Sequence, residues 1–166
     1  MELHDSMTSP IDLSGFTGWV PFAQLPTAGV PTEPGVYVVV RPTDEPPQFL
    51  DTSPAGHFKG KDPTVAATEL SGLWVPGERI VYIGKANLSA NGKRHLRKRL
   101  DEFRRFGAGA PIGHSGGRRI WQLVDHAELL VGWRVTADAD ATKVETKMLA
   151  DFRAHYGRLP FANMRG

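Results

Sequence analysis

The sequence predicts a single α+β domain. Two runs, 36–40 and 80–83, are rich in Val, Ile and Tyr, which is typical of strands. Apolar residues then recur at helical spacing after residue 92 and again after residue 138. A chain of 166 residues can bury one proper core but not comfortably two. We therefore expect one domain over residues 1–166, with its core formed by 34–41 and 79–163.

Two segments lie outside this expected core. Residues 1–33 are rich in Pro, Thr and Gly with isolated apolar anchors, which predicts an irregular lead-in with at most a short strand or turn. Pro34-Gly35 then precedes a strand over 36–41, which Pro42 ends. Residues 42–78 hold six of the 13 prolines, and we expect an ordered insertion with a short helix near 64–70.

The stretch 79–106 is expected to form a strand over 79–84, a polar loop to Gly92 and a basic helix. On a helical wheel, one stripe is apolar: Leu96, Leu100, Phe103 and Phe106. Arg99 lies inside this stripe, where a charge needs a partner or a function.

Residues 107–119 contain five Gly and one Pro. Their backbone N–H groups could face a phosphate, or the segment could be a flexible connector, and His114 within it could touch phosphate or nothing. The runs 119–124 and 129–135 predict a strand pair or one bent strand. A helix capped by Asp138 or Asp140 should follow and stop at Gly157.

This last helix also carries a charge among apolar residues. Glu145 lies at the centre of the stripe formed by Met148, Leu149, Phe152 and Tyr156. A bare carboxylate there would be neutralised or would cost several kcal/mol, so Glu145 needs a cation. The cation could be a metal ion, or Arg99 in a buried pair that serves packing alone.

Charge is distributed unevenly along the chain. Residues 85–119 hold ten of the twenty Lys and Arg but only two acids, while the rest of the chain has a net negative charge. This distribution predicts that one face of the protein binds a polyanion. The candidate nucleic-acid-binding residues are Arg94, Arg97, Lys98, Arg104, Arg105, Arg118 and Arg119.

The chain has no Cys, which excludes disulfides and thiolate metal sites. The longest purely apolar run, Val36 to Val40, is far too short to span a membrane. The N-terminus MELHDSMTSP lacks the apolar block of a secretory signal. We expect a cytoplasmic protein without a membrane partner.

Five elements together resemble the GIY-YIG nuclease superfamily. Gly35-Val36-Tyr37 and Tyr82-Ile83-Gly84 resemble its two name-giving tripeptides, and Leu96-Arg97-Lys98-Arg99-Leu100 resembles its helix segment. Glu145 and Asn163 follow in the order of the family's metal-binding Glu and its later Asn. The 44 residues between the tripeptides exceed the family's usual spacing, and the loop after Gly84 is longer than usual, so Arg94 or Arg97 could replace Arg99 as the family's Arg.

The resemblance implies a small, mostly antiparallel three-stranded sheet with strands near 36–41, 79–84 and 128–135, packed by two helices. It also implies DNA phosphodiester hydrolysis with a single divalent ion, Mg²⁺ or Mn²⁺, held by Glu145. Arg99 would take a phosphate oxygen, and Tyr37 and Tyr82 would share base and phosphate-binding roles in an order left open. Lys85 would assist a phenol, Asn163 would support the site, and His95 could relay a proton, although an exposed His is the plainer interpretation.

Three functions remain open from the sequence. The first is a metal-dependent DNA endonuclease, with RNA not excluded as substrate, acting as a monomer or a transient homodimer. The second is a nucleic-acid-binding module without turnover, and the third a protein-interaction domain with a buried Arg99–Glu145 pair. The endonuclease is favoured because both tyrosines, the Arg, the Glu and the Asn are all present.

Overall fold

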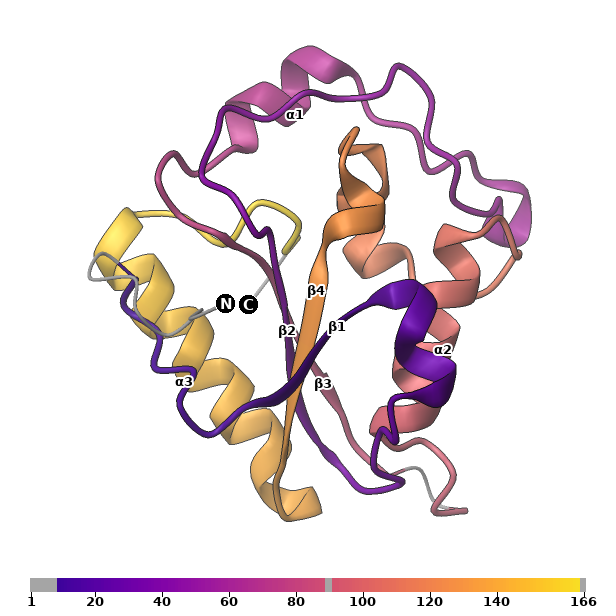
Figure 1. The fold of residues 1–166 in the computed structure, drawn as a ribbon, viewed down its shortest axis with the longest axis vertical. Coiled ribbons are helices and arrows are strands. Elements are labelled where there is room, and N and C mark those ends of the chain that lie inside the picture. The colour runs from indigo at the N-terminus through magenta and orange to yellow at the C-terminus, as the bar shows by residue number, and fades with distance from the viewer. Residues whose placement is uncertain (1–8, 89–90, 165–166) are drawn as a thin grey trace.

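A computed structural model describes residues 9–88 and 91–164, and it has an α+β fold (Figure 1). Four antiparallel strands form one sheet in the order β1-β4-β2-β3. The strands are β1 Thr17–Pro21, β2 Gly35–Val40, β3 Ile80–Ala86 and β4 Leu130–Val135. The α-helices are α1 Ala67–Leu73, α2 Leu96–Gly107 and α3 Asp138–Tyr156. Short 3₁₀ segments cover Phe22–Thr27, Phe58–Gly60, Ser115–Gln122 and His126–Glu128.

The sheet is larger than the three strands predicted, because part of the lead-in joins it. β1 pairs with β4 at the edge opposite β3. Its register shifts between Gly18 and Val20, and Gly18 and Trp19 both have positive φ. This bulge interrupts the alternation of apolar and polar residues that identifies a strand in a sequence. The sequence therefore predicts an irregular segment here.

Two further predictions need correction. Residues 119–124 are not a strand, since the chain forms a 3₁₀ segment over Ser115–Gln122 and its apolar side chains insert directly into the core. Neither Asp138 nor Asp140 caps α3, because the cap position is Ala137 and both acids lie in the first turn. There they still face the positive end of the helix dipole, which is where acidic residues are favourable.

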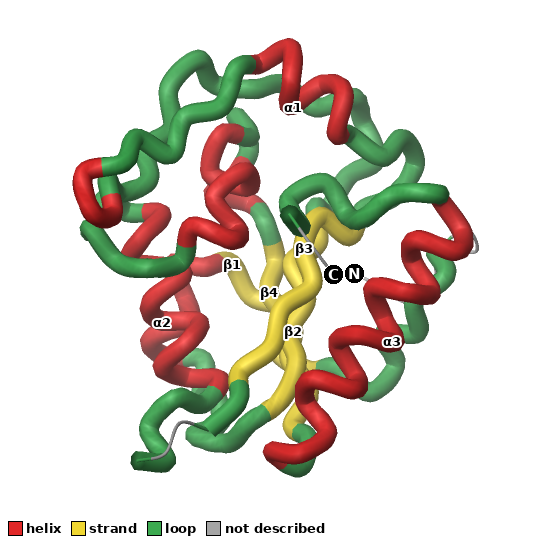
Figure 2. The backbone as a smooth tube through the Cα atoms, turned by 180° about the vertical axis from the view of Figure 1, so that it is seen from behind, coloured by secondary structure: helices red, strands yellow, loops and turns green. Residues whose placement is uncertain are grey.

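The sheet lies between two helical layers, as Figure 2 shows with α2 and α3 on opposite sides of the strands. One core cluster holds the buried stripe of α2 with Tyr37, Val39 and Tyr82. The other holds Met148, Leu149 and Phe152 of α3 with Val36, Val38 and Val40. Residues of β2 thus alternate between the two layers, and every one of them is buried.

Residues 42–78 fold back over the end of the sheet and are tied to it by buried polar groups. The Gln122 side chain donates to the carbonyls of Leu50 and Val65 and accepts from the Val65 N–H at 2.6 Å. Arg41, which follows β2, donates from Nη1 to the Glu45 carbonyl of this segment and from Nε to Asp125 Oδ2 at 2.8 Å. These bonds satisfy polar groups that burial would otherwise penalise.

The edge of β3 is covered by the C-terminal segment. The Asn163 side chain accepts from the Ile83 N–H and donates to the Ile83 carbonyl, each at 2.9 Å, and the Ala162 N–H donates to the Val81 carbonyl at 2.8 Å. The amide of Asn163 therefore takes the place of a strand peptide beside Ile83, which blocks edge-to-edge pairing there.

Replacing Asn163 with Leu should destabilise the fold by about 2–4 kcal/mol, because both backbone groups of Ile83 lose a buried partner. Asn163→Asp should also destabilise it, since a carboxylate can accept from Ile83 but cannot donate to its carbonyl. Urea unfolding monitored by fluorescence measures both. Gln24→Ala removes an exposed amide and serves as control, with an expected change below about 0.5 kcal/mol. An unchanged midpoint in Asn163→Leu would contradict this role.

No helix within residues 9–88 and 91–164 has the length and apolar character needed to cross a bilayer.

Candidate active site

Side chains from both helical layers meet in a cleft of about 410 Å³ at one end of β3. The lining comes from β2, β3 and the loop after it, α2 and α3: Tyr37, Tyr82, Lys85, Ala86, Asn87, Arg94, Arg99 and Glu145. Because β3 is an edge strand, groups carried by α2 on one face and by α3 on the other can reach around it. The structure thus brings together all four residues predicted as catalytic, along with Lys85.

Tyr37 occupies the floor of this cleft and depends on a glycine in the neighbouring strand. Tyr37 of β2 pairs in register with Gly84 of β3. A Cβ on residue 84 would lie 2.4 Å from the Tyr37 ring, closer than any side chain tolerates. The Gly of the second tripeptide therefore makes room for the Tyr of the first, and the ring of Tyr82 lies beside it with centroids 6.1 Å apart.

Arg99 is held at the wall of the cleft by α2 and by the glycine-rich segment. Its Nη1 donates to the Gly113 carbonyl at 3.2 Å and to Glu102 Oε1 at 3.4 Å. Glu102 also pairs with Arg94 at 3.5 Å, so one carboxylate orients both cleft arginines. Arg97 points elsewhere, and the cleft thus leaves Arg94 and Arg99 as the candidates for a phosphate contact.

Glu145 lies partly buried on the α3 side of the cleft. No hydrogen bond or ion pair joins it to another residue in the described part of the chain, so the Arg99–Glu145 pair considered from the sequence is not formed. Burial raises the pKa of Glu145, and the Lys85 ammonium opposes this effect. Lys85 itself donates to Thr142 Oγ1 at 2.9 Å, which holds it near the start of α3.

The two phenols are hard to ionise. Burial raises the pKa of Tyr37 well above its ordinary value, and Tyr82 adds to the effect while Arg99 opposes it. Burial also raises the pKa of Tyr82, with Arg99 as the strongest opposing influence. Tyr82 is the more exposed of the two, at 9% against 1%, so it can reach a ligand in the cleft more readily.

His114 contacts the first of these tyrosines, whereas the sequence predicted for it only a contact with phosphate or none at all. Its Nε2 lies 3.0 Å from the Tyr37 hydroxyl, and the imidazole is 1% exposed. Burial lowers its pKa well below the ordinary value, and the charge of Arg99 lowers it further. A His surrounded by Gly offers no periodicity to interpret, and only the folded loop shows that it is buried.

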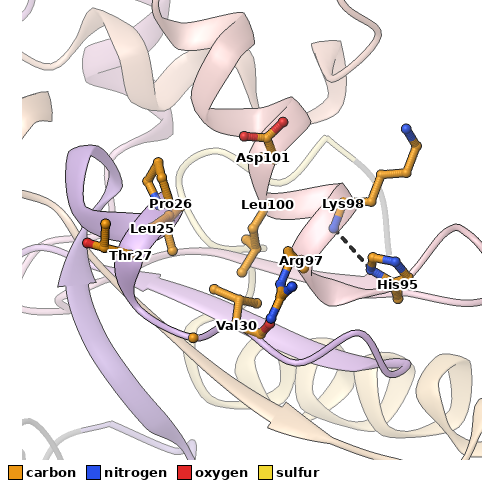
Figure 3. Close-up of a pocket in the computed structure, with 10 residues that line it drawn as sticks. Leu25, Pro26, Thr27, Val30, His95, Arg97, Lys98, Leu100 and Asp101 are labelled. Carbon is orange, nitrogen blue, oxygen red and sulfur yellow. Dashed lines mark hydrogen bonds between the residues drawn. The ribbon is translucent and has the colours of Figure 1, made fainter.

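His95 and Arg97 lie in a different hollow, of about 660 Å³, between the Phe22–Thr27 segment and α2 (Figure 3). His95 Nδ1 accepts from the Lys98 N–H at 3.2 Å and so caps α2, outside the cleft. Arg97 Nε donates to the Val30 carbonyl at 2.7 Å. The structure therefore does not place His95 where a proton relay to the cleft would need it, whereas Lys98 is exposed at the rim of this hollow.

The remaining predicted nucleic-acid contacts differ in their surroundings. Arg104 and Arg105 both pair with Asp101, at 2.7 Å and 3.7 Å. Arg118 Nη1 donates to Met164 Sδ at 3.2 Å. Arg119 is half-buried and donates to the carbonyls of Phe161 and Asn163, so it braces the C-terminal segment over β3 and is not a free surface cation.

A metal ion would have one protein carboxylate to bind in this cleft. Within residues 9–88 and 91–164, no three His, Asp or Glu side chains gather as a metal-binding group. Mg²⁺, however, is commonly held by one or two carboxylates, with water and substrate phosphate as its other ligands. Glu145 is partly buried and pairs with no cation among residues 9–88 and 91–164, so it fits that coordination.

No protein-family model, curated protein or solved structure matches this chain.

Proposed function

We propose that the protein is a divalent-metal-dependent endonuclease of the GIY-YIG type that hydrolyses DNA phosphodiester bonds. The observation that carries this proposal is the meeting of two tyrosines, Arg99, Lys85 and an unpaired carboxylate in one open cleft. A phosphodiester has one negative charge, and the hydrolytic transition state develops more. A site with fixed cations, phenols and room for one metal suits that charge.

Glu145 would hold the metal ion. Mg²⁺ or Mn²⁺ is expected because carboxylate oxygens prefer hard cations. When bound, the ion supplies polarisation of the phosphate and stabilisation of the leaving oxygen. The raised pKa of Glu145 is consistent with this role, since a bound cation would compensate the buried charge.

The chain's own residues would orient the phosphate and the attacking water. Arg99 is pre-oriented by Gly113 and Glu102 and would donate to a nonbridging oxygen, with Arg94 beside it as a second cation. Hydrolysis joins the water oxygen to phosphorus and breaks one ester bond. The proton of the water passes to an ionised tyrosine, and the departing alkoxide takes a proton from bulk water. Burial raises the pKa of Tyr37 well above its ordinary value and leaves Tyr82 the more exposed phenol, which favours Tyr82 for the proton of the attacking water.

Incubation with supercoiled plasmid tests the proposal. We expect relaxed and linear DNA with Mg²⁺ or Mn²⁺ and none with EDTA. Salt-sensitive binding without cleavage in any metal would instead support a nucleic-acid-binding module of the same fold, and absence of salt-sensitive binding would support a protein-interaction domain. The same assay on single-stranded DNA and RNA identifies the substrate class.

Lys98 gives a test, independent of catalytic turnover, of whether the basic side chains of α2 contact DNA. Its ammonium is exposed on α2, so Lys98→Gln should weaken DNA binding and reduce the slope of log K against log salt by about 1. Lys143→Gln on α3 removes an equally exposed charge from the opposite layer and should leave the slope unchanged. Fluorescence anisotropy with a labelled duplex between 50 and 200 mM salt, roughly the range in which such contacts are lost, measures both. Equal slopes in the two variants would contradict this assignment of the DNA-facing side.

A further inference from the structure

One short loop bonds to Arg99 and Tyr37 and passes close to Tyr82, three of the side chains that the proposed function uses. The Gly113 carbonyl accepts from Arg99, the His114 imidazole bonds to Tyr37, and a Cβ on Gly116 would lie 3.8 Å from the Tyr82 hydroxyl. The loop is close-packed, because a Cβ on Gly117 would lie 2.5 Å from the Phe103 ring. The glycines thus let the backbone approach the site, with His114 as its contact to Tyr37.

His114 is held more firmly than a hydrogen bond alone would hold it. Its ring stacks on Phe103 of α2 with centroids 3.7 Å apart and planes within 6° of parallel. The ring centroids of Tyr37 and Tyr82 lie 6.5 Å and 6.2 Å from the centroid of the imidazole. Arg94 and Arg99 are the charged groups that act on the imidazole, and both favour its neutral form. The ring is therefore a fixed, uncharged group behind the cleft.

A neutral imidazole has one N–H, and its position decides what Tyr37 can do. His114 Nδ1 is buried without a hydrogen-bond partner on another described residue, whereas Nε2 faces the Tyr37 hydroxyl. The imidazole also contacts the backbone of His114 itself; this contact raises the pKa of His114, but burial outweighs it. Leaving a buried N–H unpaired is rarer in proteins than leaving an acceptor unpaired. The proton is consequently better placed on Nε2, with the bare lone pair on Nδ1.

We propose that His114 is a positioning residue whose Nε2–H donates to the Tyr37 oxygen, so that the Tyr37 hydroxyl directs its own proton into the cleft. This assignment rests on the proposed function for its catalytic meaning. Tyr37 then acts as a hydrogen-bond donor toward a phosphate oxygen or the Tyr82 oxygen, and it does not take the proton of the water. Tyr82, which is the more exposed phenol, accepts the proton of the water.

The tautomer can be measured without DNA or metal. Imidazole ¹⁵N shifts of uniformly labelled protein distinguish Nε2–H from Nδ1–H, and the His114→Phe variant identifies the signals of His114 among the six histidines. We expect the Nε2–H form, unchanged as the pH falls through 6.5, the ordinary His value. An Nδ1–H form, or an ordinary titration near that value, overturns the proposal.

Activity supplies a second test with matched variants. His114→Phe keeps a ring on Phe103 but removes the donor, and plasmid nicking should fall about tenfold, the loss expected for one hydrogen bond. His114→Gln offers a side-chain N–H near the position of Nε2 and should restore most of the rate. In a Tyr37→Phe background, His114→Phe should change the rate by less than about twofold, because the oxygen it orients is absent.

Additive losses in the double variant, or no recovery with Gln, overturn the positioning role even if each protein folds. Thermal unfolding of each variant separates a folding defect from a site defect. If wild-type protein cleaves no nucleic acid, the proposed function fails. The ¹⁵N measurement still decides whether His114 donates to Tyr37, so the two failures are distinguishable.

Discussion

Replacing Glu145 with Gln is expected to lower metal-dependent plasmid nicking by about 10²–10³-fold, because Glu145 is the one carboxylate among the described residues that line the cleft. Gln keeps the size of the side chain but has no charge with which to hold Mg²⁺ or Mn²⁺. Rates should be measured as the appearance of relaxed plasmid at several metal concentrations. A variant that is as active as wild type at low metal concentration would contradict the metal-binding role.

The same variant should not lose stability. Burial raises the pKa of Glu145 in the folded protein above its unfolded value, so the folded state binds more protons in the interval between the two pKa values. Wild-type stability should therefore fall as the pH rises through that interval, and Glu145→Gln should lose this pH dependence. At neutral pH its thermal midpoint should equal or exceed that of wild type, as calorimetry between pH 4 and 8, roughly the range in which a carboxyl with a raised pKa titrates, would show.

Asp151→Asn provides the matched control on the same helix. Asp151 is a carboxylate of α3 that pairs with Lys147 at 3.0 Å on the surface, away from the cleft lining. Its replacement should leave nicking within about twofold of wild type and cost at most about 0.5 kcal/mol of stability. Loss of activity in both variants would point to a general property of α3 and not to Glu145.

Arg99→Lys should lower nicking by about 10²–10³-fold while leaving the fold intact. A Lys ammonium keeps the charge, but its three donors share one nitrogen. Donation to the Gly113 carbonyl and Glu102 would leave at most one N–H for a phosphate, whereas Arg99 keeps the donors of its other nitrogens. Steady-state rates with a short duplex substrate should show the loss mainly in kcat. Rates close to wild type would mean that point charge alone suffices at this position.

The paired variants Arg94→Lys and Arg97→Lys resolve the choice that the sequence left open. Arg97 bonds to Val30 outside the cleft, so Arg97→Lys should cleave at nearly the wild-type rate. Arg94 lines the cleft but is more exposed and more weakly held by Glu102, so we expect an intermediate loss of about tenfold. A greater loss in Arg94→Lys than in Arg99→Lys would reverse the assignment.

Local pattern was sufficient for most of the secondary structure. The strands near 36–41 and 79–84, the basic helix and the last helix follow from β-branched runs and helical spacing, and the structure contains each of them. The failures have local causes. The bulge at Gly18 obscures β1 in the sequence. The run 119–124 has the composition of a strand, but the 3₁₀ segment Ser115–Gln122 covers its first four residues, and the Gln122 side chain bonds to Leu50 and Val65 of the insertion.

The sequence by itself determined that Arg99 and Glu145 stand among apolar neighbours, since helical spacing requires only residue order. Only the tertiary structure decided what those charges face. Placement of β3 at the sheet edge lets the two helical layers share one cleft, so Arg99 turns to Gly113 and Glu145 keeps an open side. The position of His114 was also decided by the tertiary structure alone. Its loop brings it into contact with Tyr37, which lies 77 residues earlier in the chain. Contacts of that range depend on how whole elements pack, and no local pattern encodes them.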